Sequence, residues 1–396
     1  MAWRWGGLAA LLLVNRPAHA GDLDVRLDDG FLVRPYLTGQ YDQASFLESA
    51  PQGQAAGGNL RRFQMGGFLD IYDQLSVGFI YDFGHSVGSS QRVLEGSFNY
   101  TGLKPFQLKL GITKPQFSME SVEDGADTVF MERASIVNVT RNIAASSGRL
   151  SGQVLASGPR WLAAAAVTGG ITGRIDDGQQ HAVVGRAVGL PIQTRSFALE
   201  LGGSAQYVFR PPNLTGTGRS LSLSEFVELS IDPAPPSVAT GVVLVRSATV
   251  AGPEASASMG RLLLQGEWYQ ITLNRSDSAR STVFNGGYVQ AAYTVLGSPR
   301  AWDEGLGGVW AVPKAQASFN PAAGQWGAVE VAARYSTIDL QSSDIRGGRQ
   351  DIWTAAVSWW PISPVRLTAE FLHADVSGGP SPRTVNAMAG RMQLHF

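Results

Sequence analysis

Arginine dominates the chemistry available to this sequence of 396 residues: 27 of its 31 basic residues are arginine, because its lysines are only Lys104, Lys109, Lys114 and Lys314. A guanidinium group stays charged and donates two N–H groups at once, so it suits the recognition of phosphate and similar oxyanions. Eight basic residues are candidates for binding anions along a shared path: Arg61, Arg62, Lys109, Lys114, Arg133, Arg186, Arg334 and Arg366.

Strands must position these side chains, and the sequence alternates as strands do. Apolar residues at 106, 108, 110 and 112 share one face, while Lys109 lies on the other. The segments 76–83, 329–336 and 365–371 alternate in the same way and send Arg334 and Arg366 to their polar faces. One face toward lipid and one toward a polar lumen is the pattern of a transmembrane β-barrel.

Adjacent arginines pose a problem for this pattern. Successive side chains of a strand point to opposite faces, so only one of Arg61 and Arg62 enters the lumen unless the strand bulges there. For Arg334 and Arg366 the alternative is a structural ion pair, because Glu330 and Glu370 point inward on the same strands.

Composition excludes several classes of protein. Charged residues make up 16% of the chain against about 25% in ordinary globular proteins. The longest apolar run after residue 20, Trp161 to Val167, is far shorter than the roughly 20 residues of a membrane helix. A formal charge of −1 argues against binding of nucleic acid. No histidine pairing suggests a metal site, and we expect no cofactor.

The first twenty residues predict a secretory signal peptide. Arg4 precedes the apolar run Leu8 to Val14, and Ala18-His19-Ala20 is an A-x-A cleavage site. Cleavage removes Arg4 and Arg16 and leaves 29 basic against 32 acidic residues, a net charge of −3. The chain has no cysteine, so its exported fold uses no disulfides. We expect residues 21–396 to form one barrel domain in the outer membrane of a Gram-negative bacterium.

Short and long connections also alternate, as in barrels with short periplasmic turns and long external loops. Asp73-Gln74 and Pro361 to Pro364 read as tight turns, whereas Gln43 to Asn59, Gln116 to Phe130 and Ser276 to Ser281 read as polar loops. At about 20 to 25 residues per strand with its loop, the 376 mature residues predict about 16 strands, with 14 or 18 as alternatives.

Aromatic residues support the same prediction. Six tryptophans near predicted strand ends suit the membrane interface; they are Trp302, Trp310, Trp326, Trp353, Trp359 and Trp360. The last six residues alternate and end in Phe396, which resembles the C-terminal signature of outer-membrane barrels.

Ordered sequence blocks resemble the phosphate-selective porin O and P family. The stretch Trp326 to Leu340, WGAVEVAARYSTIDL, is similar to a strand of that family. Further blocks resemble family elements in the same order: Arg61-Arg62-Phe63, FMERAS at 130–135, Gly185-Arg186-Ala187 with Pro191, LQGEWY at 264–269, GYVQA at 287–291, and Gly347-Gly348 before Trp359-Trp360-Pro361.

This resemblance implies a homotrimeric, 16-stranded porin embedded in outer-membrane lipid, whose lumen is narrowed by an infolded third loop. It also implies that both Arg61 and Arg62 serve the anion path. Arg133 follows the expected constriction loop and is the best single constriction residue. A porin lowers the barrier for polar solutes, with selectivity set by pore diameter and lumen charge.

One departure from the family affects the expected solute. Phosphate-selective members carry lysine clusters that gather anions, and four lysines cannot reproduce them. We therefore expect passage of small anions, with phosphate or polyphosphate the leading candidate, and a general small-solute porin as the alternative. An outer-membrane barrel enzyme is a competing class, but G-x-S-x-G is absent and His373 near Asp375 is its only candidate base. A soluble periplasmic β-sandwich is a further alternative.

Overall fold

Alternation of apolar and polar residues builds the main sheet of this protein, here described from a computed structural model. The structure describes residues 23–48, 56–84, 92–172, 179–214, 216, 218–231, 236–277, 280–303, 305, 307–342 and 344–396. The expected signal peptide, residues 1–20, lies outside them.

Eighteen strands of the described chain form one antiparallel sheet, and sixteen of them close into a barrel. The barrel strands are β2 (Phe31–Glu48), β3 (Ala56–Ile71), β4 (Leu75–Asp82), β5 (Val93–Leu103), β6 (Phe106–Thr113), β7 (Arg149–Gly158), β8 (Trp161–Ile171), β9 (His181–Gln193), β10 (Phe197–Arg210), β12 (Val238–Met259), β13 (Leu262–Arg275), β14 (Thr282–Leu296), β17 (Ala328–Gln341), β18 (Arg346–Ile362), β19 (Val365–Ser377) and β20 (Arg383–His395). Pairing of β20 with β2 closes the ring. The predicted all-β barrel of 16 strands is confirmed.

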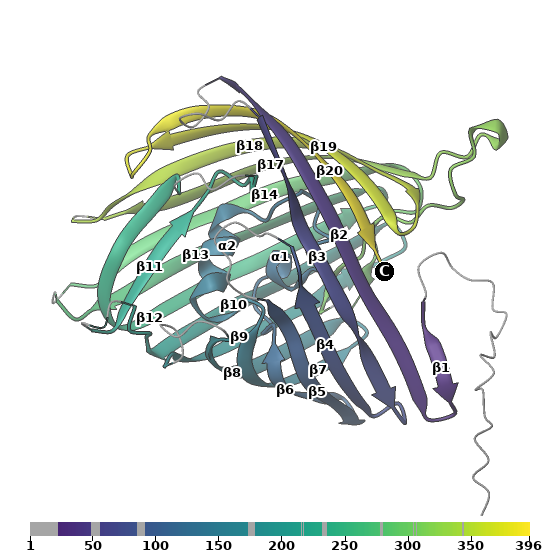
Figure 1. Ribbon diagram of the computed structural model, residues 1–396, viewed down its shortest axis with the longest axis horizontal. Helices are drawn as coiled ribbons and strands as arrows, with labels where there is room; N and C mark the ends of the chain where they lie inside the picture. The colour runs from purple at the N-terminus through teal and green to yellow at the C-terminus, as the bar shows by residue number, and fades with distance from the viewer. Residues whose placement is uncertain are drawn as a thin grey trace, which may run out of the picture.

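Smaller elements extend or fill the barrel. The strand β1 (Val25–Asp28) pairs with β2, and β11 (Ser220–Glu225) pairs with β12. A two-stranded ribbon joins β15 (Trp302–Asp303) to β16 (Val309–Trp310), and η1 (Pro321–Ala323) follows it. The helices α1 (Met119–Val122) and α2 (Ser135–Ala144) lie inside the barrel (Figure 1). Neither helix has the length and apolarity needed to cross a membrane.

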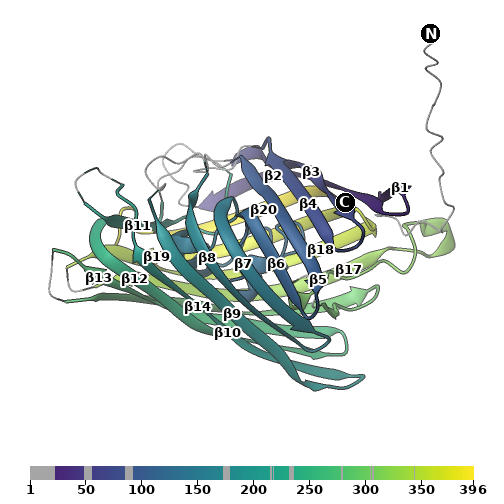
Figure 2. The same ribbon diagram turned by 90° about the horizontal axis from the view of Figure 1, so that it is seen from below.

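The two faces of the sheet differ as predicted. Phe79, Phe98 and Trp353 are exposed on the outside, with 55%, 60% and 60% of their surface accessible. Their chain neighbours turn inward and are buried or half-buried, as the alternating burial of β4, β5 and β18 shows. Figure 2 shows the tilted neighbouring strands whose outer surface carries these apolar side chains. Such a surface is suited to hydrocarbon.

Connections at the two ends of the barrel differ in length. Tight turns link β3 to β4, where Tyr72 and Asp73 have positive φ, and β18 to β19. The polar segment expected as a loop from Gln43 to Asn59 is shorter, because β2 continues to Glu48 and β3 begins at Ala56. Residues 297–327 join β14 to β17 at the turn end, where a short connection was expected.

Candidate functional site: the constriction inside the barrel

Residues 114–148, between β6 and β7, fold into the lumen, and we call them the constriction loop. Their apolar side chains explain why: Phe117, Phe130 and Ile136 are fully buried. They pack in apolar clusters that include inward side chains of the barrel wall. The helix α2 contacts β8 to β11, β13, β14 and β17, so the loop lies against that side of the wall. The prediction of an infolded loop is confirmed.

Carboxylates hold the start of each helix. Glu267 of β13 accepts hydrogen bonds from the backbone N–H groups of Met119 (2.7 Å) and Glu120 (3.2 Å) at the start of α1. Glu228, which follows β11, accepts one from the backbone N–H of Ser135 at the start of α2 (2.7 Å). Carboxylates are favourable there because helix N-termini present unpaired N–H groups and a positive dipole end.

Arg334 of β17 joins Glu228 to Glu120, a carboxylate of α1. Its guanidinium bonds Glu120 at 3.1 Å and also Glu228. It donates to the carbonyl of Glu132 at 3.0 Å and lies 4.5 Å from the centre of the Phe130 ring. The structure therefore gives Arg334 a loop-holding position, with its charge compensated by carboxylates.

Arg366 of β19 holds the same loop through carbonyl groups. It donates to the carbonyls of Thr128 (2.6 Å), Val129 (2.6 Å) and Ala126 (3.3 Å). Its guanidinium stacks over Trp360 at 4.8 Å. Carbonyls orient this cation without cancelling its charge.

Arg61 and Arg62 both reach the lumen because β3 bulges. Gln40 pairs with Arg62 and the next residue of β2 pairs with Leu60, which leaves Arg61 as the extra residue. Arg61 bonds Glu132 of the constriction loop at 2.7 Å, and Arg62 approaches the same carboxylate at 3.9 Å. Arg62 also donates to the Gln40 side chain at 2.5 Å. The bulge that two inward arginines require is therefore present.

Arg133 points back into its own loop. It donates to the carbonyls of Glu120 (2.8 Å) and Glu123 (2.6 Å) and is 7% exposed. Lys114, at the end of β6, donates to the carbonyls of Val122 (2.9 Å) and Glu123 (3.1 Å). Backbone carbonyl groups are therefore the hydrogen-bond partners of both cations.

Two other predicted residues are paired with acids. Lys109 of β6 bonds Glu95 of β5 at 2.7 Å. Arg186 of β9 bonds Glu254 of β12 at 2.8 Å, and its guanidinium also donates to the carbonyls of Gly307 and Gly308. These contacts fix the wall and the segment 307–308.

Five basic residues in and around the constriction loop repel one another. Burial and repulsion from Arg133 lower the pKa of Lys114 to about 7, with further repulsion from Arg141 and Lys109. Arg141 of α2 is in turn repelled by Arg133 and Arg62. These five residues therefore form a group of interacting cations at the constriction loop.

A second segment enters from the turn end. Residues 300–311 of the connection between β14 and β17 bring Arg300 to Glu330 of β17, at 2.8 Å. The indole N–H of Trp310 donates to Glu200 (2.9 Å) and Ser256 (2.6 Å) of the wall. This segment meets the constriction loop, where Val309 packs with Met119 and Val122.

Trp302 and Trp310 were expected at the membrane interface, and that interpretation is wrong, because both belong to this inward segment. Trp360 also faces inward and is 3% exposed, whereas Trp326 and Trp353 are 53% and 60% exposed. His373, the only candidate base for an enzyme, lies on the outer face of β19, where it bonds Asn386 at 2.8 Å.

Sequence reasoning missed two functional arginines. Arg391 of β20 bonds Asp42 of β2 at 2.7 Å and Glu132 of the loop at 2.9 Å. Strand alternation already directs Arg391 inward, so that signal was available. Arg300 had no such signal, because it lies outside the barrel strands.

A closed barrel with an apolar outer face and a polar, charged interior narrowed by infolded segments is the architecture of a transmembrane channel. The model of the family "Phosphate-selective porin O and P" matches residues 36–396, and the chain belongs to this family of outer-membrane porins.

Known relatives are distant in sequence and similar in fold. An uncharacterized protein of Caulobacter vibrioides is 26% identical over 371 residues, which cover 90% of this chain and 72% of that protein. OmpT of Vibrio cholerae aligns with a TM-score of 0.60 at 10% identity, over 93% of this chain and 98% of that one. Its trimer form gives 0.58 at 11% identity, over 93% and 100%. An anion-selective porin from Comamonas acidovorans gives 0.56 at 12% identity, over 92% and 100%.

Proposed function

We propose that this porin conducts small anions by passive diffusion, with phosphate or polyphosphate the leading solutes. The observation that carries the proposal is the group of interacting cations at the constriction loop, in which Lys114 and Arg133 bond backbone carbonyls. A carbonyl orients a cation and leaves its full charge to act on a passing anion, whereas a carboxylate partner cancels it. The description of the matched family supports the same solute class.

The eight predicted basic residues divide into two groups under this proposal. Lys114, Arg62 and Arg133 attract the anion at the narrowest region. Arg61, Arg186 and Arg334 are paired with carboxylates and Lys109 with Glu95, so they shape the path. Arg366 holds the loop through its carbonyls and also contributes positive charge. Several weak sites in series suit conduction because each must release the ion.

Selectivity should be moderate. Glu123, Asp124 and Asp127 lie in the same loop as the cations, and the sequence holds only four lysines. A tenfold preference for anions needs about 1.4 kcal/mol of differential stabilisation, which two or three cations at the constriction can supply. A general small-solute porin is the outcome if that preference is absent.

Assembly and targeting complete the proposal. We expect cleavage after Ala20, insertion in the outer membrane and assembly as a homotrimer, in line with the trimer form of the Vibrio cholerae relative. The apolar outer surface would then contact lipid and neighbouring subunits.

The experiment is the reversal potential of purified protein in a planar bilayer under a KCl gradient, with and without phosphate. The proposal requires an anion-selective reversal and a chloride current that phosphate reduces. Lys114→Met and Arg62→Gln should each weaken the reduction several-fold. Arg349→Gln, an exposed arginine of β18 paired with Asp351, is the matched control. A pore that is unselective and indifferent to phosphate contradicts the proposal and leaves a general diffusion channel.

A further inference from the structure

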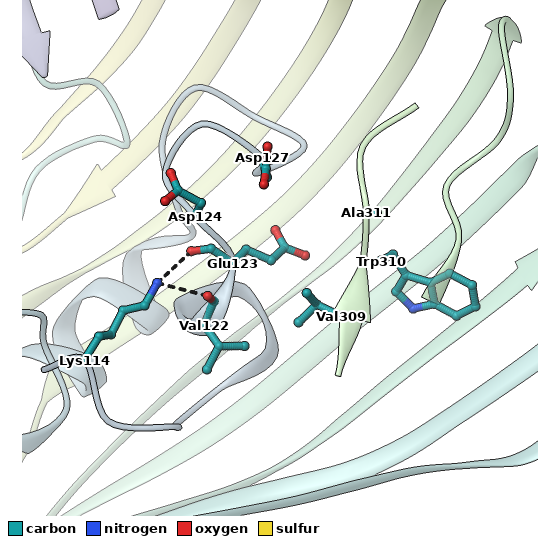
Figure 3. A pocket seen from close by; sticks show the side chains of 8 residues that line it. All are labelled: Lys114, Val122, Glu123, Asp124, Asp127, Val309, Trp310 and Ala311. Atoms are coloured by element: carbon teal, nitrogen blue, oxygen red, sulfur yellow. Dashed lines mark hydrogen bonds between the residues drawn. The ribbon is translucent and has the colours of Figure 1, made fainter. Parts of the chain in front are cut away.

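A cavity of about 140 Å³ lies where the constriction loop meets the inward segment from the turn end (Figure 3). The constriction loop contributes Glu123, Asp124 and Asp127 to the lining of the cavity. Lys114, the residue that directly follows β6, also lines it. Val309 and Trp310 form its apolar side. The cavity is partly open, so a solute in the lumen has access to it.

Most charged groups around the cavity have partners. Asp124 accepts hydrogen bonds from the Tyr36 hydroxyl (2.8 Å) and the backbone N–H of Ala126 (2.9 Å). Lys114 donates to the carbonyls of Val122 and Glu123. An ammonium group has three N–H donors, so Lys114 keeps one for a ligand.

Glu123 has a buried oxygen atom without a partner. It is 3% exposed, and its Oε2 atom is buried without a hydrogen-bond partner. Figure 3 shows its carboxylate turned toward Val309 and Trp310 and away from the Lys114 ammonium group. A buried carboxylate oxygen without a donor is costly, and groups of this kind in native proteins call for a ligand, water or a proton.

Burial accordingly raises the pKa of Glu123 to about 8, against the opposing attraction of Arg300. The carboxyl therefore takes up either a proton or a cationic donor near neutral pH. Within the described residues no group of three or more carboxylate or histidine side chains is arranged to hold a metal ion. An N–H donor of a solute fits the geometry better than a metal does.

We propose that this cavity binds a small zwitterion, an amino acid of few carbons, whose ammonium group bonds Glu123 and whose carboxylate bonds Lys114. Val309 and Trp310 line the space for the carbon atoms between the two charges. A cavity of this size accepts a molecule about as large as benzene, which limits the solute to a few heavy atoms. The inference rests on the proposed function, because the solute reaches the cavity through the pore.

The test is calorimetric titration of the purified, detergent-solubilised protein at pH 7 with glycine, ethylammonium chloride and sodium acetate. Glycine should bind most tightly, because it alone supplies both charges. Glu123→Gln should weaken glycine binding at least tenfold. Glu225→Gln, a half-buried carboxyl that bonds the backbone N–H of Phe226, is the control and should change it less than twofold. Equal binding of glycine and acetate, or unchanged binding to Glu123→Gln, overturns the proposal.

A second variant protects the test against misfolding of Glu123→Gln. Val309→Phe fills the cavity and changes no charge, so it should abolish glycine binding while chloride conductance persists. Full glycine binding by this variant also overturns the proposal. The two proposals fail in different ways. An unselective reversal potential with intact glycine binding would contradict only the proposed anion conduction. An anion-selective pore that does not bind glycine would contradict only the proposed zwitterion site.

Discussion

Arg61 and Glu132 form two parallel hydrogen bonds, 2.7 and 2.9 Å long, between the barrel wall and the constriction loop, although 71 residues separate them in the chain. Arg391 bonds the same carboxylate from β20, at 2.9 Å. A single loop carboxylate thus joins β3 and β20 through two guanidinium groups. Its removal leaves both cations without that partner.

Glu132→Gln should therefore destabilise the folded barrel strongly. Breaking a buried pair by removal of one partner costs about 3–5 kcal/mol, and we expect the lower end of this range because Arg391 keeps its bond to Asp42. Unfolding in detergent, followed by the heat-dependent shift on a gel, measures the change. Asp70→Asn breaks the more exposed Arg34–Asp70 pair and should cost at most about 1 kcal/mol. Equal effects of the two substitutions would contradict the assigned role of Glu132.

Gly125→Ala should displace Arg62 without unfolding the protein. A Cβ atom at Gly125 would lie 3.0 Å from the guanidinium carbon of Arg62, the far end of a flexible side chain. The side chain can move, so we expect wild-type stability and a two- to fivefold weaker reduction of chloride current by phosphate. Gly216→Ala is the glycine control, because nothing lies within 4 Å of a Cβ atom there, although its positive φ disfavours alanine slightly. An unchanged phosphate effect would show that Arg62 does not act on the anion.

Lower pH should increase anion selectivity. Burial, with repulsion from Arg133, lowers the pKa of Lys114 to about 7, and burial raises that of Glu123 to about 8. As pH falls from 9 to 6, Lys114 gains a positive charge and Glu123 loses a negative one, so both changes make the constriction more positive. The charged groups that interact with these two residues are Lys109, Glu120, Asp124, Asp127, Arg133, Arg141 and Arg300.

Reversal potentials at pH 6, 7, 8 and 9 measure this effect. Selectivity should change most between pH 7 and 8, and the double variant Lys114→Met, Glu123→Gln should flatten the profile. A wild-type profile that rises toward high pH would refute the assignment.

Arg366→Met should loosen the constriction loop. The substitution removes three hydrogen bonds to loop carbonyls and leaves their acceptors in a buried setting. We expect larger or noisier single-channel currents with little change in barrel assembly. Arg334→Met should disturb the channel more, because it also leaves Glu120 and Glu228 without their cation. If the single-channel currents of Arg366→Met have the same size and noise as those of the wild type, other contacts suffice to hold the loop.

The strands were predictable because alternation is a local property. Burial along β4, β17 and β19 follows the expected faces, and the adjacent Arg61 and Arg62 required the bulge that is present. Alternation also assigned Arg334 and Arg366 to the lumen. Alternation could not predict the partners of these two arginines, because the partners lie in loops more than 100 residues away in the sequence.

The inward segment 300–311 was not predictable from periodicity. Its anchors, Arg300 to Glu330 and Trp310 to Glu200, are single long-range contacts in irregular structure. Tryptophans near strand ends resemble interface anchors, and only the indole N–H bond to a buried wall carboxylate distinguishes Trp310 from one. Glu228 escaped notice for the same reason, since it follows the short strand β11.

Asp42 of β2 and Arg391 of β20 are directly paired across the junction of the first and last barrel strands, and Arg391 also holds the constriction loop. The ring of strands and the constriction are therefore both incomplete until β20 has paired with β2. Contacts so far apart in sequence form slowly, because the intervening chain has to be ordered first. We therefore expect assembly of the barrel to pass through an open sheet in which the constriction loop is not yet held. Pairing of the first and last barrel strands would then close the ring and complete the selective constriction in one step.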